Sequence, residues 1–147
     1  MQLTIQPASQ ATFDELNSWR YEPPYDFYDG DGQMPLNPER FFEAHDESGR
    51  LVGFFYFEWR GEALFYGLGM RPELTGRGAG LDFVRAGLGF ARARYRPSRL
   101  ILDVAAFNSR AVKVYERAGF RIVGRKVRHF DRWGDVEFVD MELRVAA

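Results

Sequence analysis

The chain contains no cysteine, which excludes disulfide bonds, cysteine-ligated zinc and a cysteine nucleophile. It has only two histidines, His45 and His129, too few for most histidine-based metal sites, so we expect no metal. No apolar stretch approaches the ~18 residues that a membrane span needs. The first residues, MQLTI, lack the basic start and long apolar run of a signal peptide. We therefore expect a cytoplasmic protein with no membrane partner.

The composition is typical of one globular domain. A length of 147 residues is the usual size of a single domain, and we expect one domain over residues 1–147. Hydrophobic residues make up 46% and charged residues 28%, which is ordinary for a folded protein. The aromatic share of 16% is high, and several of these residues fall within one short segment.

Charge is unevenly distributed although the net charge is only −1. Residues 1–50 hold ten acids against three arginines, whereas residues 71–99 hold seven arginines against two acids. The simplest interpretation is solvated faces. A functional interpretation is a basic half for an anionic cofactor and an acidic half for a cationic partner. The arginines do not interleave with aromatic residues, so we expect no nucleic-acid partner.

The segment 19–32 combines helix-breaking residues with large aromatic side chains. Two prolines and two glycines between Tyr21 and Gly32 predict irregular structure. A loop that carries many aromatics usually lies over the core or over a ligand. The acids in and near this loop would suit a cationic amine, although solvated loop acids are the simpler interpretation. These acids are Glu22, Asp26, Asp29 and Asp31.

Hydrophobic periodicity predicts an α/β fold with a mixed sheet and helices packed on its faces. Alternation predicts strands at 3–6, 41–45, 51–59, 64–70, 99–105, 120–130 and 136–145. Helical spacing predicts helices from a cap at Ser9 or Thr12 to about Trp19, from Leu81 to Pro97, and from a cap at Asn108 to Gly119. The three strands between 41 and 70 have connections too short for crossovers, so we expect them to form an antiparallel meander.

A glycine-rich loop, Gly76-Arg77-Gly78-Ala79-Gly80, lies between the strand at 64–70 and the helix that follows. A helix N-terminus offers unpaired N–H groups and a partial positive charge. Glycines in front of it let the backbone approach phosphate oxygens closely. A plain tight turn is the alternative, but three alternating glycines directly before a helix favour an anion site, whose usual anion is phosphate.

Three kinds of phosphate site compete for this loop. A P-loop requires a lysine, which is absent from this region. A dinucleotide fold requires Gly-x-Gly-x-x-Gly directly after the strand and an acid about 20 residues later. Here the spacing is Gly-x-Gly-x-Gly, five residues past the strand, and Asp103 lies within a strand. Coenzyme A is the third option.

Residues 68–80 resemble the pyrophosphate-binding motif of the GNAT superfamily of N-acyltransferases. This motif is usually Arg/Gln-x-x-Gly-x-Gly/Ala, and the chain has Thr75 at its first position. Residues 108–120 resemble the family's Asn-x-x-Ala-x-x-x-Tyr-x-x-x-Gly-Phe segment. The resemblance implies a mostly antiparallel sheet of about seven strands with three to four helices on its faces. It also implies acetyl transfer from acetyl-CoA, as cosubstrate, to a primary amine of a small molecule or peptide.

The resemblance assigns roles to individual residues. Tyr115 would protonate the leaving sulfur, although a core tyrosine is the alternative. Asn108 would cap its helix and contact the cofactor arm, and the backbone around Leu68 would pair with that arm. The cofactor-binding set is Leu68, Met70, Arg71, Gly76, Arg77, Gly78, Ala79, Gly80, Leu81, Asn108 and Arg117.

The general base is Asp103 by resemblance to the Leu-Glu-Val segment of ribosomal-protein alanine acetyltransferases. An acid among apolar strand residues is desolvated, which would raise its pKa into a useful range. A structural hydrogen-bond acceptor, ordered water, Glu58, Tyr66 and His129 are alternatives. A catalytically silent acyl-CoA-binding module and a nucleotide-binding domain are the rival functions, and the resemblance also allows a homodimer.

Overall fold

The structure is a computed structural model that describes residues 2–30 and 37–145. Its elements are β1 (Thr4–Pro7), α1 (Gln10–Ser18), η1 (Tyr25–Tyr28), η2 (Pro38–Arg40), β2 (Phe41–His45), β3 (Leu51–Arg60), β4 (Ala63–Met70), η3 (Pro72–Leu74), α2 (Gly80–Tyr95), β5 (Arg99–Ala105), α3 (Ser109–Arg117), β6 (Arg121–Phe130) and β7 (Gly134–Arg144). None of the helices in these two ranges has the length and hydropathy of a membrane span.

The strands form one seven-stranded sheet in the order β1-β2-β3-β4-β5-β7-β6. Neighbouring strands are antiparallel except for β4 and β5, which run parallel. The expected meander of β2, β3 and β4 is confirmed. The expected α/β class, with about seven mostly antiparallel strands and three α-helices, is confirmed as well.

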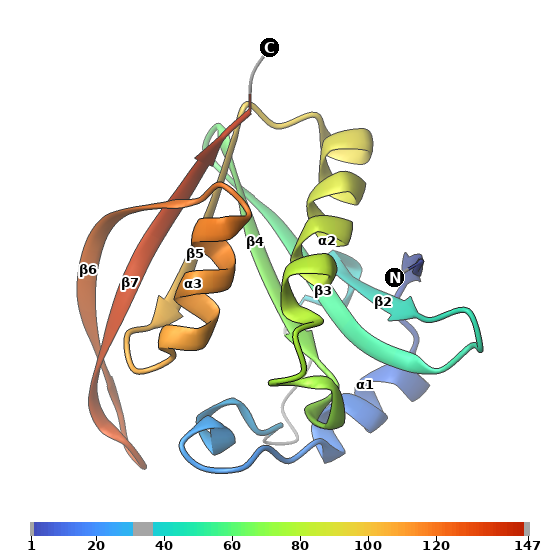
Figure 1. Ribbon diagram of the computed structural model, residues 1–147, viewed down its shortest axis with the longest axis horizontal. Helices are drawn as coiled ribbons and strands as arrows, with labels where there is room; N and C mark the ends of the chain where they lie inside the picture. The colour runs from blue at the N-terminus through green and yellow to red at the C-terminus, as the bar shows by residue number, and fades with distance from the viewer. Residues whose placement is uncertain (1, 31–36, 146–147) are drawn as a thin grey trace.

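Helices α2 and α3 cover one face of the sheet (Figure 1), and the main core lies beneath them. Close approach of α2 requires Gly87, because a Cβ there would lie 2.0 Å from the Tyr66 hydroxyl and 2.5 Å from the Phe55 ring. Helix α1 packs on strands β2 and β3 through a separate cluster that contains Phe13 and Leu16. Ser9 caps α1, since its hydroxyl accepts a hydrogen bond from the Thr12 N–H at 3.3 Å.

Strands β4 and β5 part soon after they meet. Their parallel ladder contains only the pairs Leu64–Leu100 and Phe65–Ile101, and beyond these pairs the two strands diverge (Figure 1). Peptide groups on the facing edges of the diverging ends are not used by the sheet. The parting therefore opens a gap, lined by backbone polar groups, in the middle of an otherwise continuous sheet.

The prediction that residues 21–32 lack regular structure was wrong for one turn. Residues Tyr25–Tyr28 form a short 3₁₀-helix, in which the Asp29 N–H bonds the Asp26 carbonyl at 3.1 Å. A single 3₁₀ turn needs only one or two such bonds, and the prolines precede it without interrupting it. Asp31 and Gly32 lie outside the described residues.

Candidate active site

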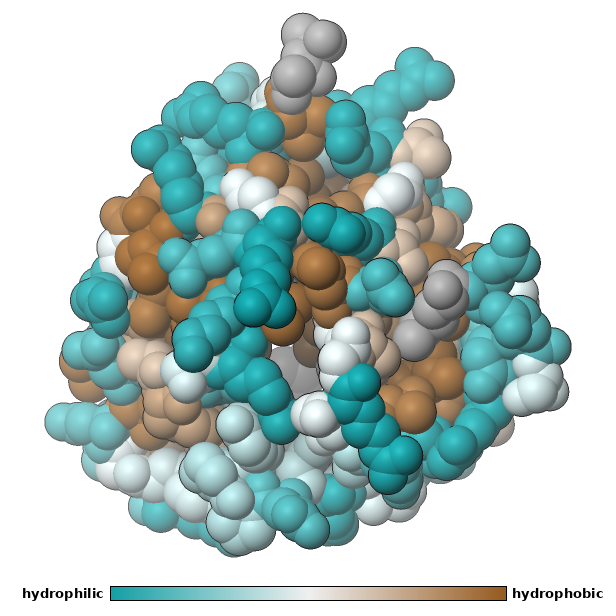
Figure 2. Space-filling view, in the orientation of Figure 1, coloured by the Kyte–Doolittle hydropathy of each residue, from teal (hydrophilic) through white to brown (hydrophobic). Residues whose placement is uncertain are grey.

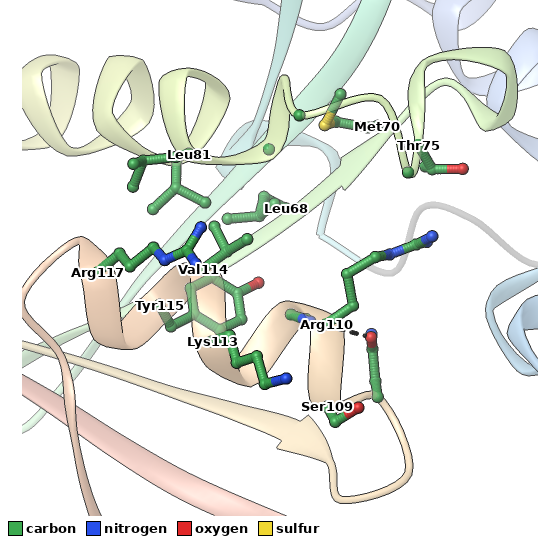
Figure 3. Close-up of a pocket in the computed structure, with 16 residues that line it drawn as sticks. Leu68, Met70, Thr75, Leu81, Ser109, Arg110, Lys113, Val114, Tyr115 and Arg117 are labelled. Atoms are coloured by element: carbon green, nitrogen blue, oxygen red, sulfur yellow. Dashed lines mark hydrogen bonds between the residues drawn. The ribbon is translucent and has the colours of Figure 1, made fainter.

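A cavity of about 440 Å³ lies between β4, the glycine loop, the N-terminal end of α2 and the length of α3. Figure 2 shows this face of the molecule hollowed near its middle, with hydrophilic side chains around the hollow. Figure 3 shows the same cavity from close by, with β4 and α2 on one side and α3 on the other. We call this the donor cavity.

The glycine loop forms one end of the donor cavity. Gly76 and Gly78 have φ angles of 73° and 80°, a backbone conformation that other residues rarely adopt. Helix α2 follows Ala79 with no side-chain cap, so the N–H groups of its first turn remain open. These N–H groups and the positive end of the helix dipole are the features that an anion site requires, and the phosphate site itself stays a prediction.

Three cations on α3 form the wall of the donor cavity opposite β4: Arg110, Lys113 and Arg117. The Arg110 guanidinium reaches toward the loop (Figure 3), and its Nη1 lies 2.8 Å from the place of a Cβ on Gly76. The Thr75 hydroxyl instead donates to the Pro72 carbonyl at 2.7 Å. Arg110 therefore supplies a basic side chain beside the loop where Thr75 cannot.

Sequence reasoning included Arg117 but missed Arg110 and Lys113. The available signal was their spacing, because residues three and seven positions apart lie on one face of a helix. The motif is defined by positions such as Asn108 and Tyr115, and the basic residues between them are not part of it.

The backbone of β4 forms the floor of the gap. The Arg71 N–H bonds the Val52 carbonyl of β3 at 2.8 Å. Because hydrogen-bonded and non-hydrogen-bonded pairs alternate along an antiparallel ladder, the N–H groups of Leu68 and Met70 point away from β3, toward β5. The Tyr21 hydroxyl donates to the Met70 carbonyl at 2.6 Å, so one of these gap-facing groups is already satisfied.

Tyr115 projects from α3 toward Leu68 of β4 (Figure 3). Burial raises the pKa of its hydroxyl, and the nearby charges of Tyr28 and Asp103 raise that pKa further. The hydroxyl therefore stays protonated across neutral pH. No hydrogen bond within residues 2–30 and 37–145 engages it. Tyr115 is thus a free proton donor at the parting of the strands.

Asn108 begins α3 as the sequence predicts. Its side-chain carbonyl accepts a hydrogen bond from the Ala111 N–H at 3.2 Å. Its Nδ2 donates to the Tyr28 hydroxyl at 3.4 Å, which links α3 to the aromatic turn η1. The capping role is confirmed, and the side chain also lines the donor cavity.

A second cavity of about 360 Å³ lies on the other side of the gap, and we call it the acceptor cavity. Aromatic rings from η1 and from three strands line much of it. The two cavities meet at shared residues, which are Leu68, Met70, Thr75, Asn108, Arg110 and Tyr115. A group that enters from one cavity can therefore reach a group in the other beside the Tyr115 hydroxyl.

Asp103 lies in the wall of the acceptor cavity, and its side chain is 13% exposed. Its Oδ2 contacts Lys126 Nζ at 2.9 Å and Arg128 Nη2 at 3.2 Å. Its sequence neighbours Leu102 and Val104 point to the opposite face of the sheet, into the helix-covered core. Asp103 is therefore held between two cations. The sequence context had suggested apolar surroundings for this carboxylate, and that expectation was wrong.

The other candidate bases lie elsewhere or are already bonded. Glu58 accepts a hydrogen bond from the Tyr56 hydroxyl, and this bond lowers the pKa of Glu58. The Tyr66 hydroxyl is buried and donates to the Val84 carbonyl at 3.0 Å. His129 contacts Asp135 near the tip of the last hairpin, at 2.9 Å.

Two predicted cofactor residues turn away from the donor cavity. The Arg71 side chain bonds the Leu51 carbonyl at 2.7 Å, pairs with Glu15 and lies over the Trp19 ring, so it ties the end of β4 to α1. Arg77 lines a neighbouring cavity on the outer side of the loop. Their backbone contribution to cofactor binding stays a prediction.

The loop acids are partly used inside the protein. Asp29 accepts a hydrogen bond from the Tyr21 N–H at 2.7 Å, and Asp26 pairs with Arg132 at 3.8 Å. Asp31 lies outside the described residues. In the described part of the chain, no three His, Cys, Asp or Glu side chains gather in a way that could hold a metal ion.

Residues 7–120 match the family model described as Acetyltransferase (GNAT) family. The chain belongs to the GNAT acetyltransferase family. The resemblance of the two sequence motifs is thereby confirmed. The first motif holds the glycine loop of this GNAT protein, and the second holds Tyr115.

Curated relatives of this GNAT protein carry the name mycothiol acetyltransferase. The relative from Mycolicibacterium gilvum (strain PYR-GCK) is 36% identical over 105 residues, which cover 67% of this chain and 35% of the relative. The relative from Acidothermus cellulolyticus (strain ATCC 43068 / DSM 8971 / 11B) is 30% identical over 141 residues, which cover 84% of this chain and 41% of the relative. The chain thus spans about a third of the length of the curated relatives it matches.

Solved structures confirm the fold of this GNAT protein. A chimera of spermidine N-acetyltransferase SpeG from Vibrio cholerae and hSSAT matches with a TM-score of 0.79 at 19% identity, over 98% of this chain and 96% of that chain. Spermidine N-acetyltransferase from Vibrio cholerae in complex with CoA and spermine matches with a TM-score of 0.74 at 21% identity, over 97% and 95%.

Proposed function

We propose that this chain is an N-acetyltransferase that moves an acetyl group from acetyl-CoA to a primary amine of a small molecule or peptide. The observation that carries the proposal is the meeting of two cavities at the parting of β4 and β5, beside the free Tyr115 hydroxyl. Membership of an acetyltransferase family supports it.

The donor cavity suits coenzyme A. The open N–H groups at the start of α2 and the α3 cations would hold the pyrophosphate. The gap-facing backbone of Leu68 and Met70 would pair with the extended pantetheine arm, as a strand pairs with a neighbour. A β4 N–H near the parting would also stabilise negative charge on the carbonyl oxygen during the reaction.

Acetyl-CoA, when bound, supplies a thioester whose C–S bond breaks as the C–N bond to the amine forms. An amine is protonated at neutral pH and must first lose a proton. We assign Asp103 to accept that proton and release it to water. Tyr115 then donates its proton to the departing sulfur and regains one from the newly acylated nitrogen, which carries one in excess. The net change is one proton released to solvent for each acetyl group transferred.

Ligand-dependent stabilisation separates this proposal from its rivals. We expect acetyl-CoA at 100 times its dissociation constant to stabilise the protein by about 2.7 kcal/mol and NAD to have no effect, measured by thermal unfolding. Stabilisation by NAD alone would favour the nucleotide-binding alternative. Stabilisation by acetyl-CoA without thiol release, across a panel of monoamines, polyamines, amino acids and peptides, would favour the silent acyl-CoA-binding module.

A homodimer and a cytoplasmic location remain predictions. One of the structural neighbours is described as dodecameric, which supports self-association in proteins of this fold. Sedimentation of the purified chain measures its assembly state directly.

A further inference from the structure

The residues that line the acceptor cavity indicate which kind of amine it would bind. Eight aromatic residues line it, contributed by the segment from Tyr21 to Tyr28, by the three strands β3, β4 and β7, and by α3. They are Tyr21, Tyr25, Tyr28, Phe54, Phe65, Tyr66, Tyr115 and Phe138. An apolar, aromatic lining with a few placed polar groups is typical of a site for a flat, largely apolar molecule.

Two glycines of β4, which have no side chain, leave space at the base of this cavity. Gly67 and Gly69 alternate with Phe65 along the cavity face of β4. A Cβ on Gly69 would lie 2.4 Å from the Phe54 ring, so the ring occupies space that only glycine leaves open. The result is a shallow aromatic floor next to the parting of the strands.

The charges around this cavity disfavour a ligand with several positive groups. Asp103 is its one carboxylate among the described residues. Two cations already contact Oδ2 of this carboxylate, and no contact in the described part of the chain engages Oδ1. Arg110, also in the lining, has no carboxylate partner there and lies 4.3 Å above the Tyr25 ring. One free carboxylate oxygen can hold one ammonium group, and the described lining offers no second carboxylate for another.

We propose that the acceptor is a monocationic primary amine carried on a planar aromatic body, with its ammonium group on Oδ1 of Asp103 and its ring between the η1 tyrosines and the β4 floor. This inference rests on the proposed acetyl transfer for its reaction, but it also predicts binding in the absence of turnover. It differs from polyamine recognition, for which the described lining holds too few free acids.

The test compares two amines that share the same reacting group. Titration calorimetry of the CoA-loaded protein with 2-phenylethylamine and with 1,4-diaminobutane measures binding, and thiol release from acetyl-CoA measures turnover. We expect phenylethylamine to bind at least about tenfold more tightly, because ring contacts add to the single charge pair. Equal or tighter binding of the diamine would overturn the inference.

The two measurements keep the inference apart from the proposed function. Binding of phenylethylamine without thiol release would support the inference and count against acetyl transfer. Thiol release with the diamine, and no binding of phenylethylamine, would support acetyl transfer and refute the inference. If neither amine binds, the inference is refuted as well.

Variants of one cavity ring locate the binding site. Tyr25→Leu should weaken phenylethylamine binding about threefold to tenfold, because a ring contact is lost. Trp59→Leu is the matched control, since Trp59 is 48% exposed and lies outside the lining. A similar loss of affinity in both variants, or no loss in Tyr25→Leu, would show that the Tyr25 ring does not contact the amine.

Discussion

Three properties of Tyr115 are compatible with its proposed role as proton donor to sulfur. It stands where the two cavities meet, no bond among the described residues engages its hydroxyl, and burial raises the pKa of that hydroxyl. The raised pKa keeps the proton in place until a thiolate, which is more basic once desolvated, can take it. The core tyrosine Tyr66 shows the contrasting case, because its hydroxyl is fixed to the Val84 carbonyl.

Replacing Tyr115 by Phe should lower turnover about 100-fold while the dissociation constant of acetyl-CoA changes less than about twofold. The reason is that the ring still packs, whereas the proton for the sulfur is gone. Steady-state thiol release and calorimetry measure the two quantities. Tyr95→Phe is the control, since Tyr95 contacts Phe57 and Trp59 away from both cavities. An unchanged rate in Tyr115→Phe would withdraw the assigned role.

Some of these residue roles could be predicted and others could not. Asn108 and Tyr115 belong to a motif with a fixed spacing. Their positions relative to each other could therefore be predicted from the geometry of one helix. The ion pairs of Asp103 come from Lys126 and Arg128 on β6, which lies two strands away in the sheet order. Contacts made through the sheet are set by pairing and register, which no local pattern encodes.

At the scale of elements, the sequence predicts strands well because their apolar residues alternate. Strands 41–45 and 99–105 have the expected bounds, α1 and α3 begin at the expected caps, and α2 begins at Gly80, one residue before its expected start. The parting of β4 from β5 was not predictable, because the number of paired residues in a parallel ladder depends on how two distant segments diverge. The turn at Tyr25–Tyr28 was missed because its few bonds leave no periodic pattern.

The glycine loop allows a matched pair of substitutions. Gly78 and Gly49 have φ angles of 80° and 85°, and neither has another atom within 4 Å of an added Cβ. Gly78→Ala and Gly49→Ala should therefore each lose about 1 kcal/mol of stability from backbone strain. Only Gly78→Ala should weaken acetyl-CoA binding, by about tenfold or more, because its strained peptide no longer faces the phosphates. Denaturation measures the loss of stability and calorimetry measures the affinity for acetyl-CoA. If the two variants bind acetyl-CoA equally well, the phosphates do not contact the loop at Gly78.

At the scale of the whole molecule, charge is divided between an acidic N-terminal part and a basic middle. The three α3 cations and the N-terminus of α2 face one cavity, so they add their fields at one place. Salt screens such fields, since the Debye length falls from ~10 Å at 0.1 M to ~3 Å at 1 M. The uneven charge distribution therefore has a measurable consequence for the donor.

The dissociation constant of acetyl-CoA should rise at least about threefold between 0.1 and 1 M salt. Arg117→Ala should weaken binding and reduce this salt dependence, because one of the cavity cations is removed. Arg92→Ala removes the same charge from an exposed position of α2 outside the cavity and should change neither quantity. Calorimetry at several salt concentrations measures both, and identical slopes for the two variants would contradict the prediction.

The parting of β4 from β5 also has a mechanical consequence. It divides the sheet into β1-β2-β3-β4 and β5-β7-β6, and each half is continuous in sequence. Only two residue pairs form the backbone ladder that joins the halves, although the core beneath α2 and α3 spans both. A ligand whose arm pairs with β4 and whose phosphates lie against α3 would contact both halves of the molecule and link them. Donor binding would then strengthen the coupling between the two halves that the shared core already provides during unfolding.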